Sequence, residues 1–305
     1  MRNAFAREIT RLAVERQDVV LLTGDIGNRL FDEFKELAPG RFLNCGVAEA
    51  NMMSVAAGMA LSGLRPVVYT ITPFITVRVL EQLRVGVCYH EAPVVVVGTG
   101  SGLSYAELGP THHSLEDIAI TRCLPGLNVL APADSQELVA FLREALENPN
   151  PTYMRIGKKG EPALHPEGAS LSIGSARTLR DGEDLVILCI GPIAAEALRA
   201  AETIAADGPR VEVVSMGSVK PLDVDFLDGL ARRCGRWITL EEHGMIGGLG
   251  STVLEWLAGT RHVVRLTRMG VPDAFIHEIG DQAFVRSTLG LDAASIHAAI
   301  KEALV

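Results

Sequence analysis

Apolar, strand-length runs alternate with segments of helical length along most of the chain, and this alternation constrains the fold more than any other feature. In the first half the runs are 19–24, 66–72 and 93–100, and the segments 48–61 and 74–90 between them have helical length. Strands that are apolar throughout are typical of parallel sheets covered by helices on both faces. The sequence therefore predicts an open α/β fold with a mostly parallel sheet.

The second half of the chain repeats the alternation after a polar interruption. A fourth strand, a turn and an amphipathic helix fill 128–147, and residues 158–184 are then polar and rich in Gly and Pro, which is typical of a boundary between domains. The further strand-like runs are 185–191, 210–219, 237–243 and 263–271. We predict two open α/β domains, the first over residues 1–165, a linker over 166–183, and a smaller second domain over 184–305.

Composition excludes several classes of function. The net charge is −9, and no long basic run is present, so the chain does not resemble a nucleic-acid binder, whose affinity rests on clustered Lys and Arg. The longest apolar runs are far shorter than the ~20 residues of a membrane span. No signal-peptide layout precedes residue 18, so we expect a cytoplasmic protein. The five cysteines are scattered singly, which favours buried thiols over disulfides or metal ligands.

Common phosphate-binding and hydrolytic motifs are absent from the sequence. It contains no GxxxxGK[ST] loop, no GxSxG elbow and no HExxH helix. The glycines of GDIGNR (24–29) and GLGS (248–251) are explained by turns near strand ends. The candidates for chemistry are therefore isolated polar residues in otherwise apolar or loop segments.

Glu49 and the adjacent pair His112 and His113 are such residues. Glu49 stands at the start of an apolar, Gly- and Ala-rich segment, where a carboxylate can cap a helix N-terminus or serve a buried site. The histidines follow a Gly-Pro turn in LGPTHHSLED (108–117), in a loop that we expect at the carboxyl edge of the sheet, where ligands bind in open α/β folds. They are either proton donors there or exposed residues of a capping loop.

Three longer stretches carry a family resemblance. GVAEANMMSVAAGMA and GPTHHSLEDIAITRCLPGLNVLAPADSQE resemble the pyrimidine-binding domain of the transketolase family of thiamine-diphosphate enzymes, and EEHGMIGGLGSTVLE resembles its C-terminal domain. The resemblance covers nearly the whole chain but matches the C-terminal half of a full-length transketolase. It implies that residues 1–165 form the pyrimidine-binding domain and that 184–305 form the transketolase C-terminal domain.

The resemblance implies a cofactor role for Glu49. In the family the equivalent glutamate hydrogen-bonds a ring nitrogen of the aminopyrimidine and favours the imino tautomer, which accepts the proton of the thiazolium carbon. Phe74 matches the aromatic residue that stacks on the pyrimidine, although two further aromatics found near it in the family are Ile71 and Val77 here. Ile71, and Asp25 of an acidic turn after the first strand, complete the cofactor-binding residues that the resemblance implies.

The resemblance also implies substrate contacts. His112 matches the histidine of the GPTH loop, which faces the substrate in the family and would share proton handling with the cofactor. Arg155 and Arg2 align with arginines that hold the sugar phosphate, a task that suits the guanidinium fork. For Phe74, Arg155 and Arg2 a structural explanation stays open, as a core phenylalanine or as surface arginines.

The sequence departs from the family where sugar hydroxyls are recognised. Gly100 and Leu108 stand where full-length transketolases have a histidine and an aspartate, and an arginine of deoxyxylulose-phosphate synthases is also missing near Gly100. The donor is therefore left open between a ketose and an α-keto acid.

The metal motif of the family, GDG followed 25–30 residues later by Asn, does not occur in the sequence, and GDI at 24–26 comes closest to it. The resemblance therefore implies that Mg²⁺ and the diphosphate are held by a second polypeptide similar to the N-terminal half of transketolase. Thiamine diphosphate would lie at the interface, in a heterotetramer with two copies of each chain.

The predicted function is that of a transferase: the C-terminal subunit of a split transketolase-like enzyme that moves a two-carbon ketol unit from a ketose to an aldose. One alternative is the β subunit of an α-keto-acid decarboxylating, acyloin-forming or deoxyxylulose-phosphate-synthase-like enzyme. A second alternative, of another class, is a non-catalytic regulatory subunit.

Overall fold

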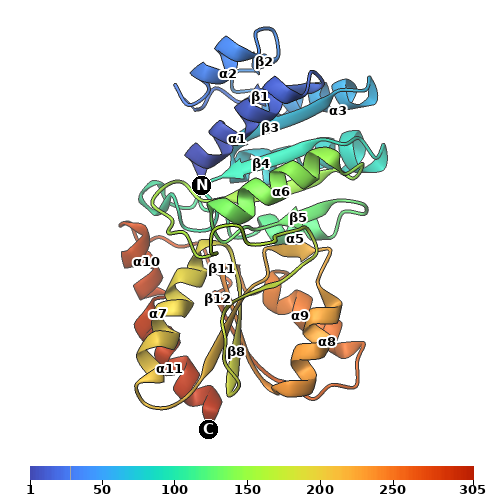
Figure 1. The fold of residues 1–305 in the computed structure, drawn as a ribbon. Coiled ribbons are helices and arrows are strands. Elements are labelled where there is room, and N and C mark those ends of the chain that lie inside the picture. The colour runs from blue at the N-terminus through green and yellow to red at the C-terminus, as the bar shows by residue number, and fades with distance from the viewer. Residues whose placement is uncertain (28) are drawn as a thin grey trace.

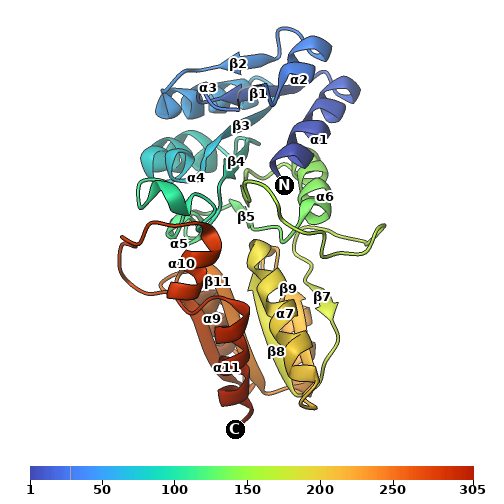
Figure 2. The same cartoon turned by 90° about the vertical axis from the view of Figure 1, so that its left-hand side faces the viewer.

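In a computed structural model that describes residues 1–27 and 29–305, the chain folds around two sheets, one from each half of the sequence. The first sheet lies above the second in Figure 1, and the same two layers of structure appear from the side in Figure 2. The predicted fold class, two open α/β domains with mostly parallel sheets, is confirmed. Among the described residues, no helix combines the length and apolarity that a membrane crossing requires.

The first sheet has seven strands in the order β10-β5-β6-β4-β3-β1-β2. All neighbouring pairs are parallel except β10 with β5. The strands β1, β4 and β6 are buried along their whole length, as the continuous apolar runs predicted. The strands of this sheet are β1 (Val19–Thr23), β2 (Phe42–Asn44), β3 (Arg65–Ile71), β4 (Val95–Thr99), β5 (Asn128–Leu130), β6 (Thr152–Ile156) and β10 (Ser218–Lys220).

Helices cover both faces of the first sheet. One face packs under α1 and α6, which lie side by side in Figure 1, and the other packs under α3 and the π-helical η2. The helical segments are α1 (Arg2–Glu15), α2 (Asp32–Leu37), α3 (Glu49–Leu61), α4 (Thr72–Ile75), η1 (Val77–Val79), η2 (Gln82–Tyr89), η3 (Ala106–Leu108), α5 (Asp117–Arg122) and α6 (Ser135–Glu147).

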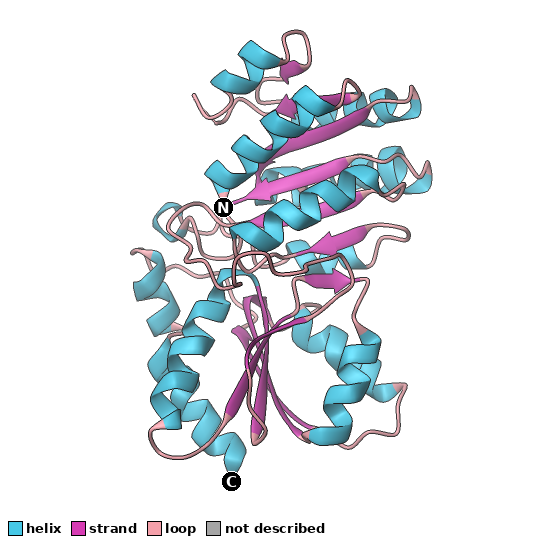
Figure 3. Cartoon of the chain, viewed as in Figure 1, coloured by secondary structure: helices cyan, strands magenta, loops and turns pink. Residues whose placement is uncertain are grey.

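The second sheet has five strands in the order β12-β11-β8-β9-β7, all parallel except β7 with β9. In Figure 3, α7 and α11 lie on one side of it and α8 and α9 on the other. The strands are β7 (Arg177–Arg180), β8 (Leu185–Ile190), β9 (Val211–Ser215), β11 (Arg236–Gly244) and β12 (Arg265–Val271). The helical segments are η4 (Gly191–Ile193), α7 (Ala194–Ala205), α8 (Val224–Arg233), α9 (Leu249–Ala258), α10 (Gln282–Thr288) and α11 (Ala293–Leu304).

The run 210–219, predicted as one strand, is divided between the two sheets. Its first part forms β9 of the second sheet, and after Met216 and Gly217 the chain enters β10, which pairs with β5 of the first sheet. Gly217 lies so close to Glu137 of α6 that a Cβ atom there would be 2.4 Å from a carboxylate oxygen. The second half of the chain thus contributes an edge strand to the first domain, and the domain limits at residues 165 and 184 stay a prediction.

The segment 74–90, predicted as one helix, is broken into α4, η1 and η2. The first break falls at Thr76, whose φ and ψ are −120° and −79° and whose hydroxyl bonds back to the carbonyl of Thr72 at 2.7 Å. Threonine hydroxyls compete for helix carbonyls, and β-branched side chains crowd the preceding turn. The regular helix is therefore interrupted at Thr76, at the edge where ligands bind in such folds.

A buried ion pair of the first domain lies at the junction with the second. Arg155 of β6 donates to Asp117 of α5 at 2.9 Å and to the backbone carbonyl of Glu242 in β11, also at 2.9 Å. Tyr153, two residues earlier on the same face of β6, donates to the other oxygen of Asp117 at 2.6 Å. Gly102 approaches the same strand with φ +59°, where an added Cβ would lie 2.5 Å from that of Glu242. Two elements of the first domain thus bind the carboxyl end of β11.

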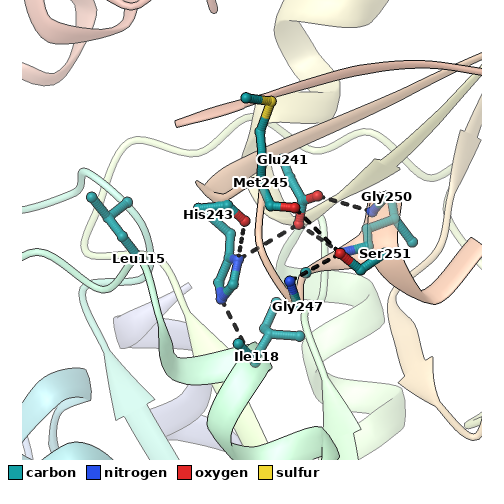
Figure 4. Close-up of polar contacts among 12 residues, drawn as sticks. Leu115, Ile118, Glu241, His243, Met245, Gly247, Gly250 and Ser251 are labelled. Carbon is teal, nitrogen blue, oxygen red and sulfur yellow. Dashed lines mark hydrogen bonds and ion pairs between the residues drawn. The ribbon is translucent and has the colours of Figure 1, made fainter. Parts of the chain in front are cut away.

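The residues on either side of Glu242 also face inward at this junction (Figure 4). The carboxylate of Glu241 accepts from the amides of Leu249 and Gly250 at the start of α9, and burial raises its pKa to about 7. His243 donates from Nδ1 to the carbonyl of Gly244 at 2.7 Å, and its Nε2 accepts from the amide of Ala119 at 3.3 Å. Burial lowers the pKa of His243 to about 4, so the ring is neutral at pH 7.

We expect His243→Gln to change how stability depends on pH. In the unfolded chain this histidine takes up a proton near pH 6.5, but in the folded chain it does so near pH 4, so the wild-type protein loses stability as the pH falls through that window. Glutamine can accept from Ala119 but does not titrate. It should cost about 1 kcal/mol at pH 7.5 through the lost Nδ1 bond, and this difference should shrink at pH 5.

Urea denaturation of the wild-type protein and of His243→Gln at pH 7.5 and pH 5 measures the difference in their free energies of unfolding. A free-energy difference that stays constant, or grows, as the pH falls would show that His243 is not held neutral by its burial.

Candidate active site

The side chains that the sequence singled out gather at the carboxyl edge of the first sheet. Gly24 follows β1, the segment of α4 and η1 follows β3, and the loop containing the histidine pair follows β4. Parallel strands present their carboxyl ends at one edge, so residues distant in the sequence meet there. The helix α3 begins at the same edge, because β2 lies next to β1 in the same orientation.

Glu49 is the first residue of α3 and is 3% exposed. Among the described residues, its carboxylate has one hydrogen-bond partner: Oε2 accepts from the guanidinium of Arg78 at 2.8 Å. A Cβ atom on Gly24 would lie 3.1 Å from the hydroxyl of Thr70 and in ordinary contact, at 3.5 Å, with Cγ of Glu49, so the chain after β1 passes close to β3 beside the Glu49 side chain. The geometry thus favours the buried-site explanation of Glu49 over helix capping.

Arg78 connects Glu49 to a row of aromatic rings. Its guanidinium carbon lies 4.1 Å from the centroid of the half-buried Phe74 ring, a cation–π contact. The ring of Phe74 meets His112 edge to face, with 5.3 Å between the centroids. The interruption of the helix at Thr76 orients both Phe74 and Arg78 toward the start of α3.

The row continues beyond His112 to Tyr105 and Lys158. The centroids of His112 and Tyr105 are 6.0 Å apart, and the ammonium of Lys158 lies 4.3 Å from the Tyr105 centroid. Lys158 also donates to Glu107 at 2.5 Å. We call these six residues the site row: Glu49, Arg78, Phe74, His112, Tyr105 and Lys158. It has a carboxylate at one end, a cation at the other, and an imidazole between them.

The imidazole of His112 is neutral at pH 7, because its pKa lies below the ordinary value. Partial burial and the positive charge of Arg78 both lower its pKa below the ordinary value. Its Nδ1 is 2.9 Å from the hydroxyl of Thr111. A neutral ring has one donor and one acceptor nitrogen, so His112 can give or take a proton at a substrate hydroxyl. His113 is buried instead, and burial lowers its pKa as well.

Asp25 and Ile71 lie at the same edge, next to the site row. Asp25 is exposed, with φ 58°, and accepts from the amide of Asn44 at 2.9 Å, while Asn44 accepts from the backbone of Gly46 at 2.9 Å. This chain of bonds fixes the loop that leads into Glu49. Ile71 is half-buried at the end of β3, directly before α4.

The two arginines expected to bind a sugar phosphate lie apart from the site row. Arg155 is 5% exposed, and its guanidinium is taken up by Asp117 and the carbonyl of Glu242. On the inner face of β6 it joins the domains, and the predicted phosphate contact stays a prediction. Arg2 is half-buried in the first turn of α1, and among the described contacts none links it to the site row.

Sequence reasoning missed Arg78, Tyr105 and Lys158. Lys158 is three residues beyond Arg155, just past the end of β6, and its side chain is 23% exposed. The available signal was position: a cation after a strand end reaches the ligand edge, whereas one within a buried strand points into the packing. Arg78 carried no such signal, because a regular helix was expected there.

The slot at the Glu49 end fits the aminopyrimidine of thiamine. It is occupied by a flat guanidinium that donates N–H to the Glu49 carboxylate and stacks on Phe74, and an aminopyrimidine offers the same flat shape and nitrogen donors. For Mg²⁺, no group of three His, Cys, Asp or Glu side chains is placed to bind a metal within residues 1–27 and 29–305.

Two family models match the chain. The model of the transketolase pyrimidine-binding domain matches residues 1–161, and that of the transketolase C-terminal domain matches residues 174–296.

Relatives of two lengths are similar to the chain. It is 35% identical to an apulose-4-phosphate transketolase subunit of Phocaeicola vulgatus, over 89% of this chain and 87% of the relative. It is also 35% identical to a 6-deoxy-6-sulfo-D-fructose transketolase subunit of Clostridium sp., over 99% and 94%. The 1-deoxy-D-xylulose-5-phosphate synthase of Aquifex aeolicus is 36% identical, over 99% of this chain but 48% of the synthase.

Solved structures give the same division. A split gene transketolase, described as an inactive beta4 tetramer, superposes with a TM-score of 0.90 at 33% identity, over 99% of this chain and 97% of the other. The transketolase of Campylobacter jejuni gives a TM-score of 0.84 at 19% identity, over 99% of this chain and 46% of the other, a likeness of fold.

We expect Arg78→Met to raise the pKa of His112. The positive charge of Arg78 disfavours the imidazolium, so its removal should move the pKa upward, while partial burial should keep it below the ordinary value. Titration of the histidine ring protons by NMR measures the shift, with Arg84→Met on η2 as a control that removes a cation outside the site row. An unchanged pKa of His112 in the Arg78 variant would contradict the electrostatic effect of Arg78 on that ring.

Proposed function

The chain belongs to the transketolase family, and on that basis we propose that it is the C-terminal subunit of a split transketolase, transferring a two-carbon ketol unit from a ketose to an aldose with thiamine diphosphate. The observation that carries the proposal is the slot between Glu49 and Phe74, where a flat nitrogen cation already makes the contacts that an aminopyrimidine needs. When bound, the cofactor supplies the carbon nucleophile and the electron sink for cleaving the bond next to a ketose carbonyl.

Each residue of the site row has a task in this proposal. Glu49 hydrogen-bonds the pyrimidine nitrogen, and its burial strengthens that bond by excluding water. Phe74 supports the ring by stacking. His112, neutral at pH 7, exchanges a proton with the substrate hydroxyl next to the cleaved bond.

Lys158 takes the anionic end of the sugar. Three relatives have names that refer to a sugar phosphate or a sulfo sugar, so an anionic group is a shared feature of the sugars for which those proteins are named. Lys158 lies at the opposite end of the site row from Glu49 and is partly exposed, which suits contact with a phosphate or sulfonate.

A partner chain completes the enzyme in this proposal. The chain spans about half of the Aquifex synthase and of the Campylobacter transketolase, and one solved structure whose length it matches is a split gene transketolase described as an inactive beta4 tetramer. We therefore assign the diphosphate and Mg²⁺ sites to an N-terminal transketolase-like subunit, in a heterotetramer with two copies of each chain. The Glu49 slot faces that partner.

A synthase-like reaction is the second candidate, because the Aquifex synthase is as similar in sequence as the split subunits. It would consume an α-keto acid and release CO₂. Two incubations of the reconstituted complex separate the candidates, one with pyruvate and an aldose phosphate and one with a ketose phosphate and an aldose phosphate. Release of CO₂ in the first supports the synthase, and two-carbon exchange between the sugar phosphates in the second, without CO₂ release in the first, supports the transketolase.

Glu49→Gln should lower kcat of the reconstituted complex by about 10²–10⁴-fold, because an uncharged amide does not favour the imino tautomer. Exposed Glu36→Gln on α2 is the matched control and should keep wild-type activity. Steady-state kinetics with saturating cofactor measures the effect. Activity of the Glu49 variant within a few-fold of wild type would favour the regulatory-subunit alternative.

Lys158→Met should raise KM for a sugar phosphate by about tenfold and leave kcat nearly unchanged, since a lost charge-assisted contact to the distal anion weakens ground state and transition state alike. The adjacent exposed Lys159→Met is the control. The difference between the two variants should vanish with the dephosphorylated sugar. Equal KM values for both variants with the sugar phosphate would remove Lys158 from substrate binding.

A further inference from the structure

Arg78 occupies the place that the proposed function assigns to the cofactor. It stands on η1, with its guanidinium between the Glu49 carboxylate, 2.8 Å away, and the Phe74 ring, 4.1 Å away. Its side chain is 45% exposed, whereas Glu49 is 3% exposed, so the arginine reaches into the slot from the solvent side. The aminopyrimidine and this guanidinium need the same carboxylate and the same aromatic face, and both cannot be there at once.

The chemistry of the two groups explains why arginine suits this place. The guanidinium is planar, stays charged, presents N–H donors in a rigid fork and stacks on aromatic rings. A lysine ammonium would satisfy the carboxylate but would not fill a flat slot. Leaving Glu49 buried without any cation or donor would cost free energy, because a buried charge needs a partner. Arg78 supplies that partner before the cofactor arrives.

We propose that Arg78 is an internal stand-in for the aminopyrimidine, which closes the slot in the cofactor-free chain and is displaced when thiamine diphosphate binds. The inference rests on the proposed function, since the displacing ligand is its cofactor. The half-exposed side chain makes displacement easier: the guanidinium returns to water by rotating about its own stem, and water already screens part of its charge.

The arrangement also gives a competition that can be measured. A binding-competent state that is populated only in part reduces the apparent affinity for a ligand by the same fraction. Removing the stand-in should therefore tighten cofactor binding. A residue that merely helped to bind the cofactor would have the opposite effect, so the sign of the change decides between the two roles.

The ion pair is tested first in the isolated full-length chain, without cofactor or partner. In the wild-type background Glu49→Gln should lower the melting temperature, because Arg78 loses its charged acceptor. In the Arg78→Met background the same substitution should raise it, because an uncompensated buried carboxylate is then neutralised. Equal shifts in the two backgrounds would overturn the inference at its first step.

Displacement is tested in the reconstituted complex by calorimetric titration with thiamine diphosphate and Mg²⁺. Arg78→Met should bind about two- to fivefold more tightly than wild type, the range expected when a weak competing ion pair is removed, and Arg84→Met should match wild type. Weaker or unchanged binding by Arg78→Met overturns the inference. Failure of the wild-type complex to bind the cofactor at all would overturn the proposed function, and displacement with it, while the stability measurements would still report on the ion pair.

Discussion

The buried contact between Asp117 and Arg155 is the interaction on which the rest of the structure depends. Replacing such a pair by apolar residues can be neutral for stability, but removing one partner leaves an uncompensated buried charge, so the pair specifies a geometry more than it stabilises a fold. Here Asp117 begins α5, Arg155 belongs to β6, and the carbonyl of Glu242 ends the contact on β11 of the other domain. The bonds hold α5, β6 and β11 in one relative arrangement. An apolar contact would not specify that arrangement, because it lacks directional bonds.

That arrangement determines where the histidine loop lies. His112 is five residues before Asp117, and the intervening Ser114 is bridged to Gly102 across the loop. With both ends of the loop held, the imidazole is presented edge-on to Phe74. The second domain therefore takes part in the candidate site without contributing a residue to the site row: the junction at β11 supports the loop from behind, and the segments after β2, β3, β4 and β6 carry the side chains.

The sequence predicted the features that repeat or that belong to a motif. Apolar runs separated by helical segments predicted the two mostly parallel sheets, and the motif around Glu49 indicated a buried carboxylate at the start of a helix. What it did not reveal depends on tertiary packing. The run 210–219 is uniformly strand-like, so its passage from one sheet to the other is invisible in its composition. In the stretch RIGKK, Arg155 and Lys158 are both cations near a strand end. The difference between them, inward on β6 or outward beyond it, is decided by Asp117, a residue 38 positions away.

A carboxylate that must be shielded from water to act on a cofactor destabilises the fold when the cofactor is absent and nothing else pairs with it. In the proposed function Glu49 needs low exposure for strong hydrogen bonding to the cofactor, yet burial without a partner is unfavourable. A fully buried cation would remove that cost but would be harder to expel, since its attraction to the carboxylate would not be screened by water. An arginine that is nearly half exposed meets both requirements: it neutralises the carboxylate from outside and can leave through water. The breaks around η1, which a regular helix over 74–90 would lack, are what place Arg78 where it can do so.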